Sequence, residues 1–339
     1  MLSKQLKARS PAKLILSGEH AVVYGNPAIA IAVDRYAEST VISSLSSAIL
    51  FNCRNLKYAK SCTLHTLRAL KKRLQDEYHA FLEGRCGIRD VLQKPFELLQ
   101  FTVTHLLETW NIPLSQGLEI RASSEIPIGC GMGSSAALVM STLYALAHFL
   151  KLEIDPSRFI SLGREAENLQ HGFSSGLDLQ LAMNGGCLRF EEGEISKRSI
   201  PDLPLTIVQT GIPETSTGES VIAVAKHFKN SSIASDFAAI TNRFDEALQG
   251  NHVDWMQDCI RENHRLLTKI GVVPIKVQEF IRTLELQGGA AKICGAGSVA
   301  GDKAGVVLVV SDRDLSSIAK DYGYCVQQVQ GDYHGTHIV

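Results

Sequence analysis

The sequence has almost no excess of charge of either sign. Its 339 residues carry 34 lysines and arginines against 35 aspartates and glutamates. A balanced chain has no broad positive field to attract nucleic acid or an anionic membrane, so a small anionic substrate has to be held by local charges. The short basic run at 67–73 fits the solvated face of a helix better than a binding patch. We therefore expect no nucleic-acid partner.

Paired cysteines and long apolar runs are also missing. The eight cysteines are scattered, with neither a Cys-x-x-Cys pair nor the spacing of metal ligands, so we expect reduced thiols. The N-terminal segment is polar and lacks a signal-peptide core, and no stretch is apolar for long enough to span a bilayer. These features predict a cytoplasmic enzyme with no membrane partner.

Two common nucleotide-binding motifs are absent as well. The segment closest to a Walker loop, residues 295–303, has the wrong spacing and places Asp302 before Lys303. The glycine spacing at 129–133 does not match the dinucleotide-binding turn. A bound phosphate therefore requires a different architecture.

A glycine-rich loop does stand directly before an apolar run. Residues 127–137 read Pro-Ile-Gly-Cys-Gly-Met-Gly-Ser-Ser-Ala-Ala, and the apolar run 138–152 follows. The glycines allow positive φ and close approach of a ligand, while a helix N-terminus offers free N–H groups and a positive dipole end. Ser134 and Ser135 can cap the helix, donate to a phosphate or ligate Mg²⁺. We expect an anion here, with a plain helix cap as the alternative.

The N-terminal segment gathers three charged or titratable side chains at one turn. Lys13 begins the apolar run 14–16, Glu19 and His20 interrupt it, and a second apolar run follows at 28–33. This pattern predicts two short strands around a polar turn. A lone histidine in a turn is more often a plain polar residue, so the other motifs decide how it is interpreted.

A second glycine-rich segment lies late in the chain, at residues 288–305. Residues 292–294 predict a strand that enters a turn at Gly295, and the apolar run 306–310 predicts the next strand. Dense glycine here indicates either a second backbone wall around a ligand or a surface hairpin.

Two carboxylates follow the glycine loop on separate predicted elements. A helix is expected at 158–171, and Ser174 or Ser175 can cap a short second helix that carries Asp178 in its first turns. Glu167 on the first helix can therefore converge with Asp178. One can hold a metal while the other faces an acceptor hydroxyl; the alternative is that both are ordinary solvated residues.

These segments, in this order, resemble the three motifs of the GHMP kinases. The first motif, at 11–25, is most similar to that of the mevalonate kinases because it contains Gly-Glu-His-Ala-Val-Val. Residues 40–105 stay unmatched. The third motif departs from the family pattern at 298–303, where a glycine run is expected, and Gly-Phe-Ser-Ser-Gly replaces the usual Gly-Asn-Pro-Ser-Gly, so that Phe173 could narrow the acceptor pocket.

The resemblance implies an α+β fold with two domains. Residues 1–203 would form a domain like domain 2 of ribosomal protein S5, and residues 204–339 a ferredoxin-like domain, with ATP in the cleft between them. The last strand is a candidate to return to the first domain. A chain of 339 residues also exceeds what one core usually holds.

The resemblance further implies a kinase that uses ATP and Mg²⁺ to phosphorylate the 5-hydroxyl of mevalonate. Asp178 and Lys13 would be catalytic, and the sequence leaves open which of them activates the hydroxyl. Glu167 and Ser135 would bind Mg²⁺. The implied ATP-binding residues are Gly129, Gly131, Met132, Gly133, Ser134, Ser135 and Ala136. The implied substrate-binding residues are Lys13, Glu19, His20, Asp178, Thr217, Gly295 and Ala296.

Two other functions stay open at this point. Another small-molecule GHMP kinase, acting on phosphomevalonate or a sugar, would need different groups around the acceptor. A non-catalytic nucleotide sensor is expected to have lost Glu167 or Asp178, and both are present. The oligomeric state is undetermined, with a homodimer as one alternative.

Overall fold

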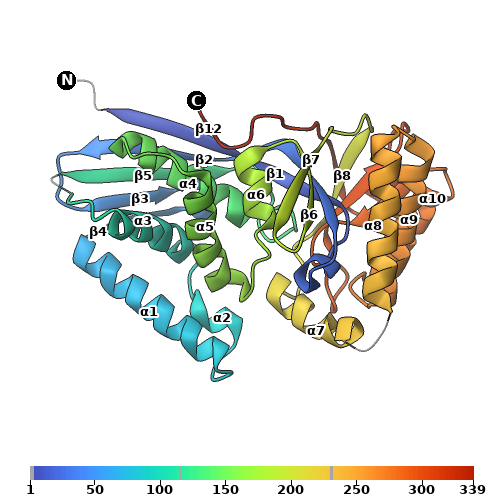
Figure 1. Ribbon diagram of the computed structural model, residues 1–339, viewed down its shortest axis with the longest axis horizontal. Helices are drawn as coiled ribbons and strands as arrows, with labels where there is room; N and C mark the ends of the chain where they lie inside the picture. The colour runs from blue at the N-terminus through green and yellow to red at the C-terminus, as the bar shows by residue number, and fades with distance from the viewer. Residues whose placement is uncertain (1–3, 115, 230–231) are drawn as a thin grey trace.

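The computed structural model describes residues 4–114, 116–229 and 232–339, which form two β-sheets with helices packed on them (Figure 1). The elements of the first part are β1 (Gln5–Ser17), η1 (Ala21–Tyr24), β2 (Ala28–Ser44), β3 (Ile49–Cys53), η2 (Arg54–Leu56), β4 (Tyr58–Cys62), α1 (Leu64–Leu82), α2 (Ile88–Val91), α3 (Glu97–Thr109), β5 (Gly117–Ser124), α4 (Ser134–Leu150), α5 (Pro156–His171), α6 (Leu177–Asn184), β6 (Cys187–Glu191) and β7 (Glu194–Arg198). The elements of the second part are β8 (Leu205–Gly211), α7 (Thr217–Lys229), α8 (Ile233–Gln249), α9 (Val253–Lys269), α10 (Ile275–Glu285), β9 (Ala290–Ile293), β10 (Gly305–Val310), α11 (Ser316–Asp321), β11 (Cys325–Gln328) and β12 (His337–Ile338).

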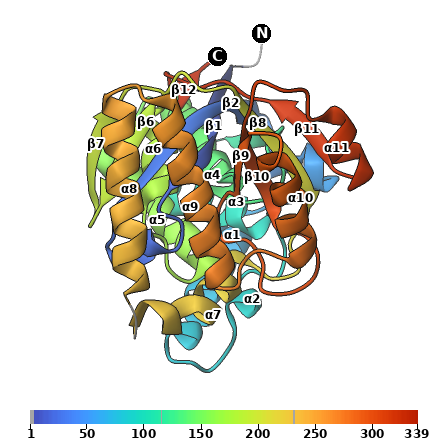
Figure 2. The same ribbon diagram turned by 90° about the vertical axis from the view of Figure 1, so that its right-hand side faces the viewer.

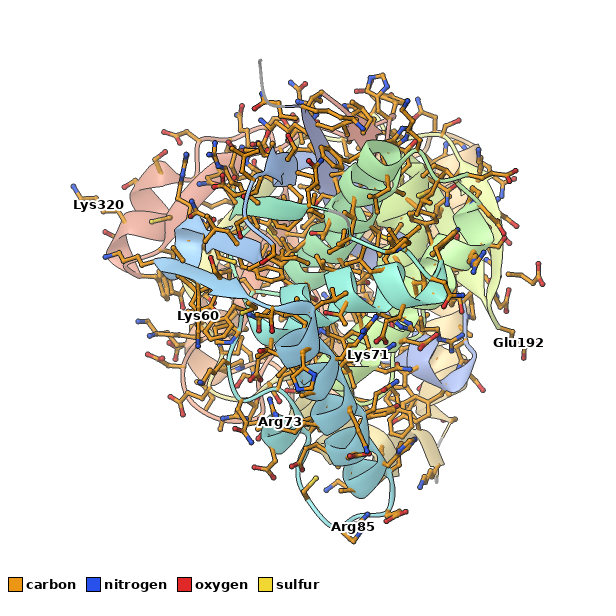
Figure 3. All side chains as sticks on the ribbon, turned by 90° about the vertical axis from the view of Figure 1, so that its left-hand side faces the viewer. Lys60, Lys71, Arg73, Arg85, Glu192 and Lys320 are labelled. Carbon is orange, nitrogen blue, oxygen red and sulfur yellow. The ribbon has the colours of Figure 1, made fainter. Side chains whose placement is uncertain are left out.

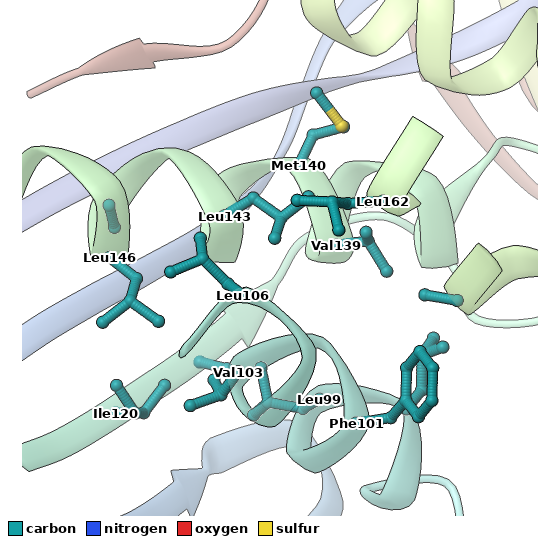
Figure 4. Close-up of a cluster of buried hydrophobic side chains, with 14 of the residues drawn as sticks. Leu99, Phe101, Val103, Leu106, Ile120, Val139, Met140, Leu143, Leu146 and Leu162 are labelled. Carbon is teal, nitrogen blue, oxygen red and sulfur yellow. The ribbon is translucent and has the colours of Figure 1, made fainter. Parts of the chain in front are cut away.

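The first sheet has the strand order β12-β1-β2-β5-β3-β4, and β6 and β7 continue from the early part of β2. Helix α4 packs on β1 and β2, and α3 and α5 pack on α4. Because α4 is apolar around most of its circumference, it fits a position buried between a sheet and other helices. Figure 4 shows the resulting core, which includes Leu99, Val103 and Leu106 of α3, Ile120 of β5, and Val139, Leu143 and Leu146 of α4.

The second sheet has the order β11-β8-β10-β9 and is antiparallel throughout. In chain order this is fourth, first, third, second, the order of a ferredoxin-like sheet. Helices α8, α9 and α10 stand side by side at this end of the molecule (Figure 2). Helix α9 buries Met256, Ile260 and Leu267, which lie along one face at helical spacing. The structure confirms the α+β fold.

Strands β1 and β2 are much longer than the two short strands that the sequence indicated. They contain 13 and 17 residues and pair antiparallel, with Lys13 opposite Ala32 in the interior of β1. The prediction stopped too early because residues 5–12 and 34–44 mix polar and apolar side chains, whereas backbone pairing continues through them. At the far edge of β1, Ala8 and Arg9 pair with β12, so the C-terminal tail lies against the first sheet.

Helices α1 and α3 are joined by ion pairs from the basic run at 67–73. Lys71 donates to Glu108 and Arg73 to Glu97, each at 2.7 Å. Figure 3 shows Lys71 and Arg73 along α1, and Arg85 beyond its far end. The run lies on a helix as expected, and Arg68 and Lys72 are exposed, but Lys71 and Arg73 are half-buried and bind α3 instead of facing only solvent. No helix among the described residues is long and apolar enough to cross a membrane.

Candidate active site

A cavity of about 580 Å³ lies where the glycine loop, the first motif and the second sheet meet. Predicted site residues that line it are Lys13, Glu19, His20, Gly129, Gly131, Met132, Gly133, Ser134, Ser135, Glu167, Asp178, Thr217, Gly295 and Ala296. Ala136 of α4 is the exception: it does not line the cavity, and its side chain is fully buried in the core. Segments separated by more than 280 positions are thus brought to one place.

The glycine loop ends at the N-terminus of α4. Its three glycines have φ values of 72°, 85° and 70°, and Gly133 is the N-cap of the helix. Ser134 and Ser135 therefore stand in the first turn and do not cap it, which corrects one of the alternatives for these residues. Their free N–H groups and hydroxyls face the cavity end of the helix, where an anion is stabilised.

The glycine loop is held against the other two motifs by backbone contacts. The N–H of Lys13 donates to the carbonyl of Met132 at 3.0 Å. A Cβ added to Gly131 would lie 2.2 Å from the carbonyl oxygen of Cys294, and one added to Gly295 would lie 2.8 Å from Cα of Gly131. Both positions therefore require glycine, because any side chain would separate the second motif from the third.

Lys13 and Asp178 form an ion pair directly beside this loop. Lys13 Nζ lies 3.3 Å from Asp178 Oδ1, and the lysine side chain is almost completely buried. A Cβ on Gly133 would be 2.9 Å from Lys13 Cγ and 3.4 Å from Asp178 Oδ2. The N-cap of α4 consequently lies in contact with a cation and a carboxylate.

Helix α6 presents Asp178 in its first turn. The cap differs from the expected serine: Gly176, with φ of 89°, is the N-cap, and Ser175 Oγ accepts instead from the N–H of Leu177 at 3.3 Å. Gly172, the C-cap of α5, and Gly176 both have positive φ, so the chain turns between the two helices. Across this turn, Asp178 lies close enough to Glu167 for its charge to raise the pKa of Glu167.

Glu167 is buried and has one oxygen without a partner. Its Oε1 makes no hydrogen bond, and burial, together with the nearby charge of Asp178, raises its pKa to about 8. His171 Nε2 lies 3.3 Å from Ser135 Oγ and 3.7 Å from Glu167 Oε2. Burial lowers the pKa of His171 to about 4, so this ring is neutral at pH 7. Burial thus disfavours the charged form of Glu167, and a cation beside its free oxygen would stabilise that form.

The donors around Glu167 suit a hard divalent cation. A carboxylate oxygen and the Ser135 hydroxyl are the oxygen ligands that Mg²⁺ prefers. Among the residues that the structure describes, no three histidine, cysteine, aspartate or glutamate side chains form a metal cage. A metal ion here would therefore take its remaining ligands from phosphate and water.

Glu19 belongs to a buried polar network that sequence reasoning did not find. Lys292 of β9 donates to the Glu19 carboxylate and, at 2.9 Å, to the carbonyl of Ile15. Asn263 of α9 donates to the second Glu19 oxygen at 2.8 Å. In the sequence, the feature that could have indicated this network is Lys292, a lysine inside an apolar strand. Because both Glu19 oxygens are engaged, this side chain connects the first motif to the second sheet.

His20 faces the third motif. Its Nε2 lies 3.0 Å from the carbonyl oxygen of Ala296, and its backbone has φ of 60°, which is uncommon outside glycine. Burial lowers the pKa of His20 to about 4, so the ring is neutral and can donate to that carbonyl. The turn at residues 18–20 and the loop at 295–296 therefore form one wall of the cavity.

The segment that matched no motif also lines the cavity. Its lining residues include Arg89 of α2, Leu92 directly after α2, Pro95 and Leu98. Phe173 also lines it. This residue is 64% exposed, and the centroid of its ring lies 6.1 Å from that of Phe81. Sequence reasoning noted Phe173 and missed the others, because no motif marks them.

Comparison with known proteins matches this geometry to one family. Residues 97–186 match the model of the GHMP kinases N terminal domain. The chain is 31% identical to the mevalonate kinase of Archaeoglobus fulgidus over 292 residues, covering 86% of this chain and 88% of that one. It is 29% identical to the mevalonate kinase of Thermococcus onnurineus over 303 residues, covering 86% of each.

A solved structure shows the same fold over nearly the whole chain. The mevalonate kinase of Methanococcus jannaschii superposes with a TM-score of 0.80 at 24% identity, covering 97% of this chain and 99% of that chain. The sequence relatives and the shared fold agree with the motifs gathered around the cavity. The chain therefore belongs to the GHMP kinases, among the mevalonate kinases, and is an ATP-dependent kinase of a small molecule.

Proposed function

We propose that the protein transfers the γ-phosphate of ATP to the 5-hydroxyl of mevalonate, giving 5-phosphomevalonate and ADP. The observation that carries this proposal is the Lys13–Asp178 pair, 3.3 Å apart, in contact with the N-cap of α4. A phosphate at that helix end would lie beside a cation and a base. The names of the sequence relatives support mevalonate as the acceptor.

The chemical step needs little more than positioning and charge neutralisation, because the transition state of phosphoryl transfer is loose. In our proposal the N–H groups at the start of α4 hold the phosphates, and the acceptor oxygen forms the new bond to the γ-phosphorus. The bond between that phosphorus and the β,γ-bridging oxygen breaks, and ADP leaves with the electron pair. Asp178 accepts the hydroxyl proton, while Lys13 offsets negative charge at the acceptor oxygen.

We assign the metal site to Glu167 and Ser135. The buried Glu167 oxygen without a partner supports this assignment, since a cation would satisfy it. Bound there, Mg²⁺ would neutralise charge on the β- and γ-phosphates. His171 Nε2 is within hydrogen-bond distance of the Ser135 hydroxyl and so orients it.

The acceptor would lie between the wall at 18–20 and 295–296 and the first turn of α7. We assign contacts with it to His20, Thr217, Gly295 and Ala296, all of which line the cavity. Glu19 acts on the acceptor indirectly in this proposal, because Lys292 and Asn263 occupy both of its oxygens.

We also propose that residues 1–203 and 204–339 are two domains with the active site between them. Residues 1–203 contain the first sheet except its edge strand β12, residues 204–339 contain the second sheet, and the cavity is lined from both parts. All eight cysteines are free, which supports a reducing compartment and hence the cytoplasm.

The direct test is coupled ADP release with Mg·ATP and a panel of mevalonate, phosphomevalonate, homoserine and galactose. Turnover with mevalonate well above the other acceptors is the expected result. Preference for another acceptor would move the function to a different small-molecule kinase of the same family. ATP binding with no turnover on any acceptor would refute catalysis.

A further inference from the structure

The cavity has few positive charges for a substrate that carries several negative ones. Among the described residues that line it, Lys13 and Arg89 are the only lysine or arginine side chains. Lys13 is buried and paired with Asp178, and the ring of His20 is neutral because burial lowers its pKa to about 4. A carboxylate of the acceptor needs a cationic partner in a cavity with so few positive charges, and Arg89, whose side chain is 60% exposed, can supply one.

Arg89 is held in place by one of its terminal nitrogens. Nη2 donates to Glu219 Oε2 at 2.5 Å and to the carbonyl of Glu214 at 3.0 Å. Glu219 is itself fixed, since its Oε2 accepts from the N–H of Ser216 at 2.7 Å while Ser216 Oγ accepts from the N–H of Glu219 at 3.3 Å. This is a capping box at the start of α7.

The remaining donors of Arg89 are available. Nε and Nη1 make no hydrogen bond to any residue that the structure describes, although the guanidinium is already oriented by Glu219 and Glu214. A fixed guanidinium with free N–H groups matches a carboxylate in geometry and charge, and it loses less side-chain freedom on binding than a mobile lysine does.

Arg89 also lies on the acceptor side of the cavity. Its neighbour Ile88 packs against the first turn of α7, where a Cβ on Gly218 would be 3.3 Å from Ile88 Cγ2 and 3.0 Å from the carbonyl oxygen of His171. The same turn of α7 begins at Thr217, which lines the cavity. The free donors are therefore next to the elements that carry the proposed acceptor contacts.

We propose that Arg89 binds the carboxylate of the acceptor acid and so determines specificity for an acidic over a neutral alcohol. This inference rests on the proposed function, because it takes the acceptor to be a small hydroxy acid. Arg89 joins α2 to α7 while it does so, through its ion pair with Glu219.

The test is steady-state kinetics of the full chain with Arg89→Gln and Arg89→Lys. We expect Arg89→Gln to raise KM for mevalonate roughly 10- to 100-fold, the loss expected for a charge-assisted hydrogen bond, while kcat and KM for ATP change less than about threefold. Arg89→Lys should recover part of the affinity because it keeps the charge. Arg85→Gln is the matched control, since Arg85 is exposed, pairs with Glu83 and does not line the cavity.

A neutral analogue separates carboxylate recognition from general damage to the pocket. In 3-methylpentane-1,3,5-triol an alcohol replaces the acid, so Arg89→Gln should leave its inhibition constant unchanged. An equal rise for mevalonate and the triol would overturn the proposal, as would an unchanged KM for mevalonate. A rise in KM for ATP alone would instead assign Arg89 to the nucleotide phosphates.

A failure of the proposed function gives a different result from a failure of the Arg89 proposal. In that case the unmodified protein does not phosphorylate mevalonate, whatever the Arg89 variants do. If it uses homoserine, which also carries a carboxylate, the same split between acceptor KM and ATP KM tests Arg89. Turnover with galactose alone would overturn both proposals.

Discussion

Replacing Lys292 with methionine tests the buried network that joins the two sheets. The lysine is fully buried and Glu19 is 1% exposed, so the two charges are satisfied only by each other and by their hydrogen-bond partners. Lys292→Met keeps most of the volume but leaves Glu19 with Asn263 alone and removes the donor to Ile15. Breaking a buried pair by removing one partner costs about 3–5 kcal/mol.

The magnitude is large against the stability of a folded protein, which is about 5–15 kcal/mol. In a protein of this size it corresponds to a fall in melting temperature of roughly 4–7 °C. The assay is thermal unfolding at pH 7, followed by differential scanning fluorimetry and circular dichroism. Lys320→Met is the control, because Lys320 is exposed on α11 (Figure 3), and it should melt within about 2 °C of the unmodified protein.

A double variant shows whether the unpaired charge causes the loss. Glu19→Gln combined with Lys292→Met replaces the ion pair with a neutral amide that can still bond to Asn263. We expect it to be more stable than Lys292→Met alone, because no charge remains buried without a partner. If Lys292→Met melts within 2 °C of the unmodified protein, or if adding Glu19→Gln lowers stability further, the reasoning is refuted.

Three further predictions concern catalysis, the glycine loop and pH. Asp178→Ala should lower kcat by about 10² to 10⁴, the range for loss of a general base, with KM for ATP little changed; unchanged turnover in the same coupled assay would exclude Asp178 as the base. Gly131→Ala should lower both kcat/KM for ATP and the melting temperature, since its Cβ would lie 2.2 Å from a carbonyl oxygen. The control is Gly193→Ala, where φ is 90° but nothing lies within 4 Å of the added Cβ, so only the conformational cost of about 1–2 kcal/mol is expected. Equal effects of the two substitutions would contradict the close packing of the loop. Burial lowers the pKa of His264 from 6.5 to about 4, so the unfolded chain binds a proton there that the folded chain does not, and stability is lost as pH falls from 6.5 towards 4. His264→Leu should therefore lose less stability than the unmodified protein over that window in melting curves, and parallel curves would speak against the shift.

Much of the candidate site was predictable because its residues follow local rules. The glycines at 129–133 stand before an apolar run, and only a helix with a backbone-exposed N-terminus fits that order. The helix that carries Glu167 was expected at 158–171 and occurs as α5. Caps were less predictable: serines flank both helix starts, but Gly133 and Gly176 take the N-cap positions because the chain turns there with positive φ.

Other features depended on contacts that no local pattern encodes. Residues 40–105 contain no motif, yet α2 supplies Arg89 to the cavity. The lysine of β9 is visible in the sequence, but its partner Glu19 lies 273 positions away. Such pairings follow from how the sheets pack, since a charge buried in a strand must find its partner wherever the fold brings one.

By itself, the sequence determined the class of chemistry. Three glycine-rich or charged segments follow one another in the chain. They provide backbone that can approach a phosphate, and a lysine and two carboxylates that can act on it. These features are visible in the sequence because backbone freedom and side-chain chemistry are local properties. The tertiary structure alone decided which groups meet: Lys13 with Asp178, Glu19 with Lys292, and Arg89 with Glu219. Burial and distance set the protonation of Glu167, His20 and His171, and both are properties of the packed chain.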